Sequence, residues 1–265
     1  MNKILAIAKK ELSIYFTTVI GYSCFAGFAL LLGYMFNQYL TGFILQSQSF
    51  VQARNQAGLA TLNLNDMVIA PTYYNALFLF LFIVPFLTMR LFADEKRMKT
   101  FELLMTIPTT PLQIVLGKYL AGVVMIGVIC LIALIHPALL SIFTTDASGQ
   151  GSGIEWVSVL SGLYGVFMMG CAFVAVGLLA SALTESPIVA AFGAFVALLI
   201  WWLMSWGART AEGWQRDILT YLAPPTHVEA AISGLFVTAD LAFFLVAIVV
   251  CLFLCHRVVE AHRWQ

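Results

Sequence analysis

Charged residues are scarce in this sequence. Asp, Glu, Lys and Arg make up 10% of its 265 residues and hydrophobic residues make up 62%, whereas about 25% of a typical soluble domain is charged. The 13 basic and 13 acidic residues balance, so the formal net charge is zero. The composition therefore argues against a soluble globular domain and against nucleic acid as a partner.

Cysteine is sparse as well, and its spacing indicates neither a disulfide framework nor a metal site. The five cysteines lie within apolar runs or at their ends, unlike the cysteines of small secreted proteins. Cys251 and Cys255 share one helix face, but two thiols at that spacing are weak evidence for a metal. We expect this chain to bind no metal and no other cofactor.

Long apolar runs take the place of charge. Because a run of about 20 apolar residues can cross a bilayer as a helix, we predict an all-α integral membrane protein that forms one transmembrane domain over residues 1–265. Its six transmembrane helices are expected near Val19–Phe36, Tyr73–Phe92, Tyr119–Phe143, Trp156–Leu183, Pro187–Trp206 and Leu235–Cys255. Pro187 fits the first turn of the fifth helix.

The distribution of Lys and Arg predicts the orientation. If the N-terminus is cytoplasmic, ten of these residues fall on the inner side and three on the outer side, as expected when positive charge stays inside. Both termini should then be cytoplasmic. Glu11 and Ser13 interrupt the first apolar run, so we expect no cleaved signal peptide.

The segments outside the spans also have distinct patterns. Residues 1–16 alternate apolar and charged positions and predict an amphipathic helix in the cytoplasmic interface, although a simple anchor at the membrane is the alternative. Residues 37–71 are rich in Asn and Gln and predict a polar outer loop. Residues 207–234 predict a second outer segment, part of which could enter the membrane edge as a short hairpin.

Much of the charge is concentrated in residues 94–118, on the predicted inner side. Within it, Phe101, Leu104 and Met105 fall on one helix face, Thr100 could cap the first turn, and Pro108 and Pro111 would end the helix. Two interpretations are open. The stretch is either a solvated loop that fixes topology, or a short cytoplasmic helix whose apolar face is covered by lipid or by a protein groove.

Residues 85–122, PFLTMRLFADEKRMKTFELLMTIPTTPLQIVLGKYLAG, resemble the permeases of type-2 ABC exporters, and most closely the gliding-motility-associated subgroup. The shared pattern is Pro, Met-Arg, two acidic residues, Thr-x-Glu-Leu-Leu, Pro and Gly-Lys. Residues 178–191 and 222–264 resemble the same subgroup. Two positions depart from the pattern, because the usual glycine before Thr100 is Lys99 and the first acidic residue is Asp94.

The resemblance implies that the short helix over residues 98–107 is a coupling helix, which docks into a cytoplasmic ATPase and transmits its motion to the spans. The implied ATPase-docking residues are Glu95, Arg97, Lys99, Thr100, Phe101, Glu102, Leu103, Leu104 and Met105. Glu185, in the turn before the fifth span, is a possible second contact or a helix cap. The resemblance places the chain in the bacterial cytoplasmic (inner) membrane.

The implied partners are two copies of the ATPase subunit, a second copy of this permease or a homologous one, and membrane lipid. An extracytoplasmic accessory subunit is a further candidate. ATP and Mg²⁺ would be bound by the ATPase, because this chain has no phosphate-binding loop: Tyr119 follows its Gly117–Lys118 pair, and Leu112 stands where the first glycine would be. We therefore expect a non-catalytic subunit.

Other classes of function receive less support from the residues. An intramembrane enzyme needs facing catalytic groups within the spans, and His136 is the one candidate well inside a span. A channel or secondary transporter is the main alternative, but spans 1–3 and 4–6 show no evident repeat. Asp240, His227 and Glu229 near the outer side are expected to face water or to cap interfacial helices.

Overall fold

The computed structural model of the chain describes residues 3–101, 109–144 and 153–261. Every regular element in these ranges is a helix, and six of the helices are long and apolar enough to cross a membrane. The predicted fold class, an all-helical protein with six long apolar helices, is confirmed. The elements are α1 (Lys3–Thr17), α2 (Val19–Gln52), α3 (Gln56–Ala60), the π-helix η1 (Asn65–Ile69), α4 (Ala70–Thr88), α5 (Arg90–Arg97), α7 (Pro111–Phe143), α8 (Trp156–Ala182), α9 (Pro187–Thr210), α10 (Trp214–Leu222), α11 (Thr226–Ile232) and α12 (Thr238–Ala261).

The helices α4 and α8 form the centre of the bundle. In the apolar windows of the α4 and α8 spans, 72% and 61% of residues are buried, against 11% for α2 and 17% for both α9 and α12. Apolar side chains on α4, α7 and α8, among them Phe80, Met125 and Phe173, are fully buried together. The outer helices α2, α9 and α12 therefore leave most of their apolar surface uncovered by this chain.

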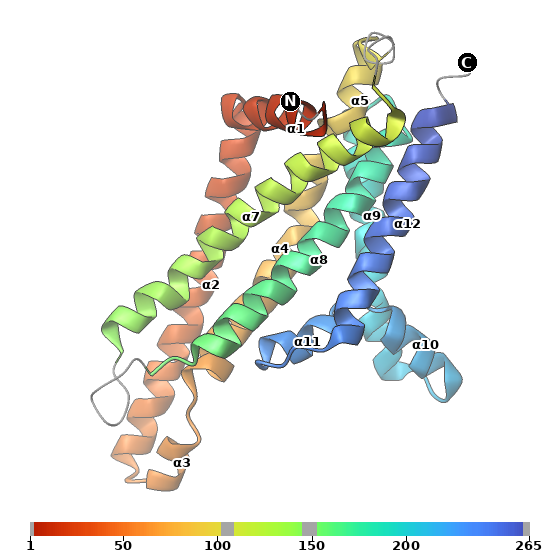
Figure 1. Cartoon of the computed structure of the whole chain (residues 1–265). Coiled ribbons are helices and arrows are strands. Elements are labelled where there is room, and N and C mark those ends of the chain that lie inside the picture. The colour runs from red at the N-terminus through yellow and green to blue at the C-terminus, as the bar shows by residue number, and fades with distance from the viewer. Residues whose placement is uncertain (1–2, 102–108, 145–152, 262–265) are drawn as a thin grey trace.

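The short helices gather at the two ends of the bundle (Figure 1). At the upper end of the view, α1 lies across the long helices, next to α5, and the start of α7 and the end of α12 are close by. We call this the α1–α5 end. At the opposite end lie α3, α10 and α11. The helix α1 and the C-terminal end of α12 are thus at the same end of the bundle.

One predicted loop is wrong. Residues 37–71 were expected to form a polar outer loop, but α2 continues to Gln52, and α3 and η1 follow before α4 begins at Ala70. The Asn and Gln residues after the apolar run of α2 do not stop a helix, because polar side chains on an exposed face are compatible with helical backbone.

Two prolines begin helices. Pro187 occupies the first turn of α9, as the sequence predicted. Pro111 occupies the first turn of α7, whose N-cap Thr110 forms a reciprocal capping box with Gln113. Pro111 was expected to end the predicted helix over residues 98–107, most of which lies outside the described residues. In the structure it begins α7, because proline lacks the N–H that the first turn does not use.

Candidate functional site

The end of α5 leads directly into the predicted coupling segment. Its last turn is closed by two backbone hydrogen bonds, from Lys99 N to Lys96 O (3.1 Å) and from Thr100 N to Glu95 O (3.0 Å). This is the Schellman pattern, in which the residue after the C-cap adopts the left-handed region and is usually glycine. That residue is Lys99, with φ of 55°. The departure from the family's glycine at Lys99 therefore falls on the residue whose backbone favours glycine.

The α5 helix is also fixed to the end of α8. The backbone N–H groups of Phe92 and Ala93 donate to Ser181 Oγ at 3.0 and 3.2 Å, and that hydroxyl donates to Met89 O at 3.0 Å. Lys96 Nζ donates to Ala182 O at 2.5 Å. Ser181 thus binds the start of α5 and Ala182 binds its last turn, so both ends of α5 are attached to the end of α8.

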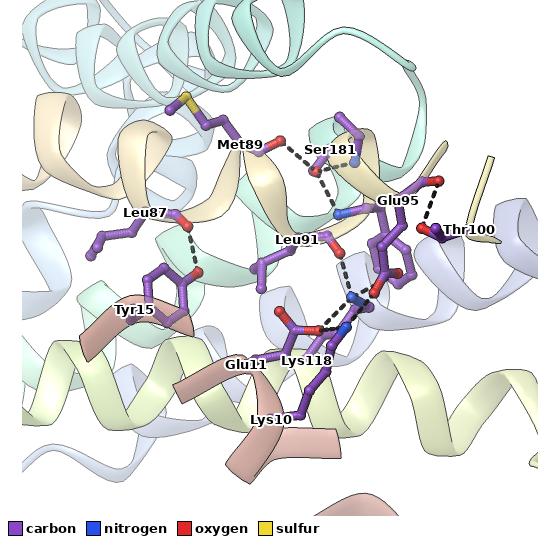
Figure 2. A network of polar contacts seen from close by, with 12 residues as sticks. Lys10, Glu11, Tyr15, Leu87, Met89, Leu91, Glu95, Thr100, Lys118 and Ser181 are labelled. Carbon is purple, nitrogen blue, oxygen red and sulfur yellow. Dashed lines mark hydrogen bonds and ion pairs between the residues drawn. The ribbon is translucent and has the colours of Figure 1, made fainter. Parts of the chain in front are cut away.

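A buried lysine connects α5 to α7 and α1 (Figure 2). The side chain of Lys118, on α7, is 1% exposed. Its Nζ donates to Glu11 Oε1 on α1 at 2.9 Å and to Leu91 O on α5 at 2.5 Å. It also lies 2.9 Å from Glu95 Oε2, as an ion pair without hydrogen-bond alignment.

Lys10 completes this group, which we call the Lys118 cluster: Lys10, Glu11, Glu95 and Lys118. Lys10 Nζ donates to Glu95 Oε1 at 2.7 Å and to Glu11 Oε1 at 3.0 Å. Burial lowers the pKa of Lys10, but the hydrogen bonds and charges of Glu95 and Glu11 outweigh it and leave the pKa raised. Two ammonium groups and two carboxylates balance, as a buried ionic cluster requires.

The α1 helix packs tightly beside this cluster. Its buried residues Ala8, Glu11 and Tyr15 follow one helix face. Tyr15 Oη donates to Leu87 O of α4 at 2.5 Å. A Cβ at Gly117 would lie 2.8 Å from Ile7 Cβ, so a larger residue there would collide with α1. The Gly-Lys pair of α7 therefore performs two tasks, because Gly117 admits α1 and Lys118 binds it.

The structure separates the predicted docking residues into three groups. Arg97, Lys99 and Thr100 are exposed at the end of α5, and Glu185 is exposed in the turn between α8 and α9. Glu95 points inward to the Lys118 cluster, and Phe101 is 7% exposed and packs edge-on against Phe92. The remaining ones lie outside the described residues: Glu102, Leu103, Leu104 and Met105.

His136, the one catalytic candidate of the sequence, and the outer-side residues His227 and Asp240 have partners within the chain. His136 Nδ1 lies 3.3 Å from Ala133 O, and its ring makes a tilted contact with Phe36, with centroids 5.0 Å apart. His227 Nδ1 lies 2.7 Å from Asp240 Oδ1 and its Nε2 lies 2.7 Å from Tyr221 O at the end of α10. Asp240 thus pairs with His227 instead of facing only water. Within the described ranges, no group of three or more His, Cys, Asp or Glu residues could hold a metal ion.

A comparison with protein families decides the class. The model described as "ABC-2 family transporter protein" matches residues 5–260. The chain belongs to the ABC-2 transporter family. This ABC-2 permease is a multi-pass membrane component without catalytic chemistry of its own, and permeases of the family pair with ABC ATPases generally. No curated protein matches the chain.

Proposed function

We propose that this permease is driven by a separate cytoplasmic ATPase that grips residues 98–107, and that the α1–α5 end responds as one unit. The observation that carries the proposal is the Lys118 cluster, which joins α1, α5 and α7 through contacts of 2.7–3.0 Å. A force on the segment after α5 would pass through Glu95 to Lys118 and so to the α7 span.

A second connection supports the same path. Ser181 and the Lys96–Ala182 contact attach α5 to the end of α8, which belongs to the centre of the bundle. Nucleotide-driven motion needs an element that takes two arrangements of packed helices. Because α5 is attached to both α7 and α8, a movement of α5 can shift those two spans together. The exposed residues offer polar contacts for the ATPase: Arg97, Lys99, Thr100 and Glu185.

The proposal takes the α1–α5 end as cytoplasmic and places both termini on that side of the bacterial inner membrane. Two ATPase copies, carrying ATP and Mg²⁺, would serve two permeases. The uncovered apolar faces of α2 and α9 offer surface for a second permease copy or for lipid, and an extracytoplasmic accessory subunit would meet the opposite end. The finer likeness to the gliding-motility-associated subgroup, and a mechanotransmission role without transported cargo, rest on the sequence motifs alone.

Replacing Glu102 and Leu104 by Ala in the complex purified with its ATPase tests the coupling. We expect loss of the ATPase stimulation that the permease provides, with normal membrane insertion. Arg97→Glu and Lys99→Glu should weaken the same coupling, whereas Arg257→Gln, an exposed change on α12, should not. Unchanged coupled ATP hydrolysis in the first two sets of variants would contradict the proposal.

A further inference from the structure

Two neighbouring cavities lie along α4, on the side that α1 and α2 cover. The first, of about 540 Å³, opens between α1 and α5 and has charged and apolar walls. The second, of about 680 Å³, lies between α2 and α4 and has mostly apolar walls. Phe86 lines both, so we treat them as one α2–α4 groove. Each volume lies in the range of ligand sites, roughly 300–1,000 Å³.

The charged end of the groove carries both signs. Lys10 and Arg90 line it together with Asp94 and the two carboxylates of the Lys118 cluster. Lys118 does not line the cavity but pairs with both of these carboxylates. Among the described residues, three cationic groups therefore balance three anionic groups at this end: Lys10, Arg90 and Lys118 against Glu11, Asp94 and Glu95. Arg90 Nε lies 3.4 Å from Asp94 Oδ2, and within the described chain its terminal amino groups make no other ion pair.

The apolar end begins where the charges stop. Phe28, Leu31 and Phe82 line it, and Gly27 of α2 opens it further, because a Cβ at Gly27 would meet nothing within 4 Å. The order along the groove is therefore charged mouth, Phe86, apolar trough. That order matches a molecule with a polar head at the end of the spans and a hydrocarbon tail directed toward their middle.

We propose that the α2–α4 groove is a binding site for one zwitterionic phospholipid, with its phosphate between Lys10 and Arg90, its ammonium at Asp94 and one acyl chain beside Gly27. Because the cationic and anionic groups at the charged end are equal in number, a headgroup that carries both charges fits it better than one that carries a single charge. An anionic headgroup would meet the same two cations but would leave Asp94 without a cation from the ligand, whereas an ammonium group on the ligand pairs with that carboxylate.

The lipid site lies next to the predicted coupling segment. Met98 and Thr100 line the charged mouth, so a bound headgroup would lie beside the first residues of the segment 98–107. The site itself does not depend on the proposed coupling to an ATPase, because it is defined by the groove and its charges. A failure of the ATPase experiment would therefore leave the lipid proposal standing, and the reverse holds as well.

Native mass spectrometry of the full chain in detergent tests the site. Delipidated protein is mixed with equal amounts of phosphatidylethanolamine and phosphatidylglycerol that have identical acyl chains. We expect about tenfold preferential binding of phosphatidylethanolamine, the effect of roughly one charge-assisted contact. Arg90→Gln and Gly27→Leu should each reduce this binding about tenfold, and Asp94→Asn should shift the preference toward phosphatidylglycerol.

Two matched controls separate the groove from general lipid contact. Gly42→Leu places the same side chain on α2, where a Cβ also meets nothing within 4 Å, and Arg257→Gln removes an exposed charge on α12. Neither should change binding. Equal binding of the two lipids, displacement of the lipid by inorganic phosphate alone, or groove variants that behave like the controls would each overturn the proposal.

Discussion

Lys118 Nζ lies 2.9 Å from Glu11 Oε1, although 107 positions separate the two residues in the chain. Lys118 is 1% exposed, and removing its ammonium would leave the two carboxylates Glu11 and Glu95 with Lys10 as their one shared cation. Breaking one side of a buried ionic group typically costs about 3–5 kcal/mol. We expect Lys118→Met to lower the free energy of unfolding of the purified permease by that amount, which a thermal scan records as a lower unfolding midpoint.

A combined variant distinguishes charge from packing in this cluster. Lys118→Met together with Glu11→Gln and Glu95→Gln removes the buried cation and both carboxylates and leaves Lys10, whose side chain is 53% exposed, as the one charge of the cluster. Because water can solvate that ammonium, much of the stability should return. Lys9→Met, an exposed change on the same α1 helix, serves as the control. If the triple variant is no more stable than Lys118→Met alone, the ionic account of the cluster is wrong.

Replacing Lys99 by glycine should stabilise the protein. Its φ of 55° lies in the left-handed region, which costs a residue with a Cβ about 1–2 kcal/mol. Lys99→Gly is therefore expected to raise the unfolding midpoint by roughly 2–4 °C for each kcal/mol gained. Arg54→Gly, at the other non-glycine position with positive φ among the described residues, should act in the same direction. A lower midpoint for Lys99→Gly would show that the lysine side chain stabilises this turn.

The sequence predicted the six long apolar helices because burial in lipid requires such helices, and hydropathy measures that property directly. It failed for residues 37–52 because hydropathy locates the apolar part of α2 but carries no information on where its backbone stops being helical. Pro187 was interpreted correctly because the constraint of proline is local. The fold class thus followed from properties that short windows of sequence contain.

The candidate site depends on partners that no local pattern identifies. Glu95 was expected on the docking surface, whereas the structure turns it toward Lys118, which lies beyond the coupling segment. A lysine at the start of an apolar helix does signal that a carboxylate must be near. The sequence offers several carboxylates at this end of the bundle, and the choice of Glu11 and Glu95 required the tertiary arrangement.

Gly117 is expected to control the attachment of α1. A Cβ there would lie 2.8 Å from Ile7 Cβ and 3.0 Å from Ile4 O, so Gly117→Val should force α1 away from α7. Limited trypsin digestion at Lys9 and Lys10 then becomes faster, because cleavage follows local opening. Ile7→Ala in the same chain should partly restore resistance.

The matched control for that variant lies on the same helix. A Cβ at Gly127 would have Phe167 Cε2 at 3.9 Å as its nearest neighbour, which is ordinary contact, so Gly127→Val should leave the digestion rate at Lys9 and Lys10 unchanged. Equal rates for the two valine variants would mean that α1 does not need the close approach at Gly117.

His227 is expected to hold α10 and α12 together. Both ring nitrogens lie 2.7 Å from acceptors, one on Asp240 and one at the Tyr221 carbonyl, and the ring stacks on Phe243 with centroids 4.0 Å apart. His227→Phe keeps an aromatic ring for stacking but removes both polar contacts. Because Asp240 and the carbonyl lose their partner, the free energy of unfolding should fall by about 1–3 kcal/mol.

A comparison with Asp240→Asn assigns that loss to a particular contact. The amide oxygen can still accept from His227 but carries no charge, so this variant should lose less stability than His227→Phe if the hydrogen bond to Tyr221 O contributes separately. His227→Ala should lose more than His227→Phe, because it also removes the stacking on Phe243. If thermal unfolding gives equal midpoints for His227→Phe and the unmodified chain, the two polar contacts do not stabilise this end of the bundle.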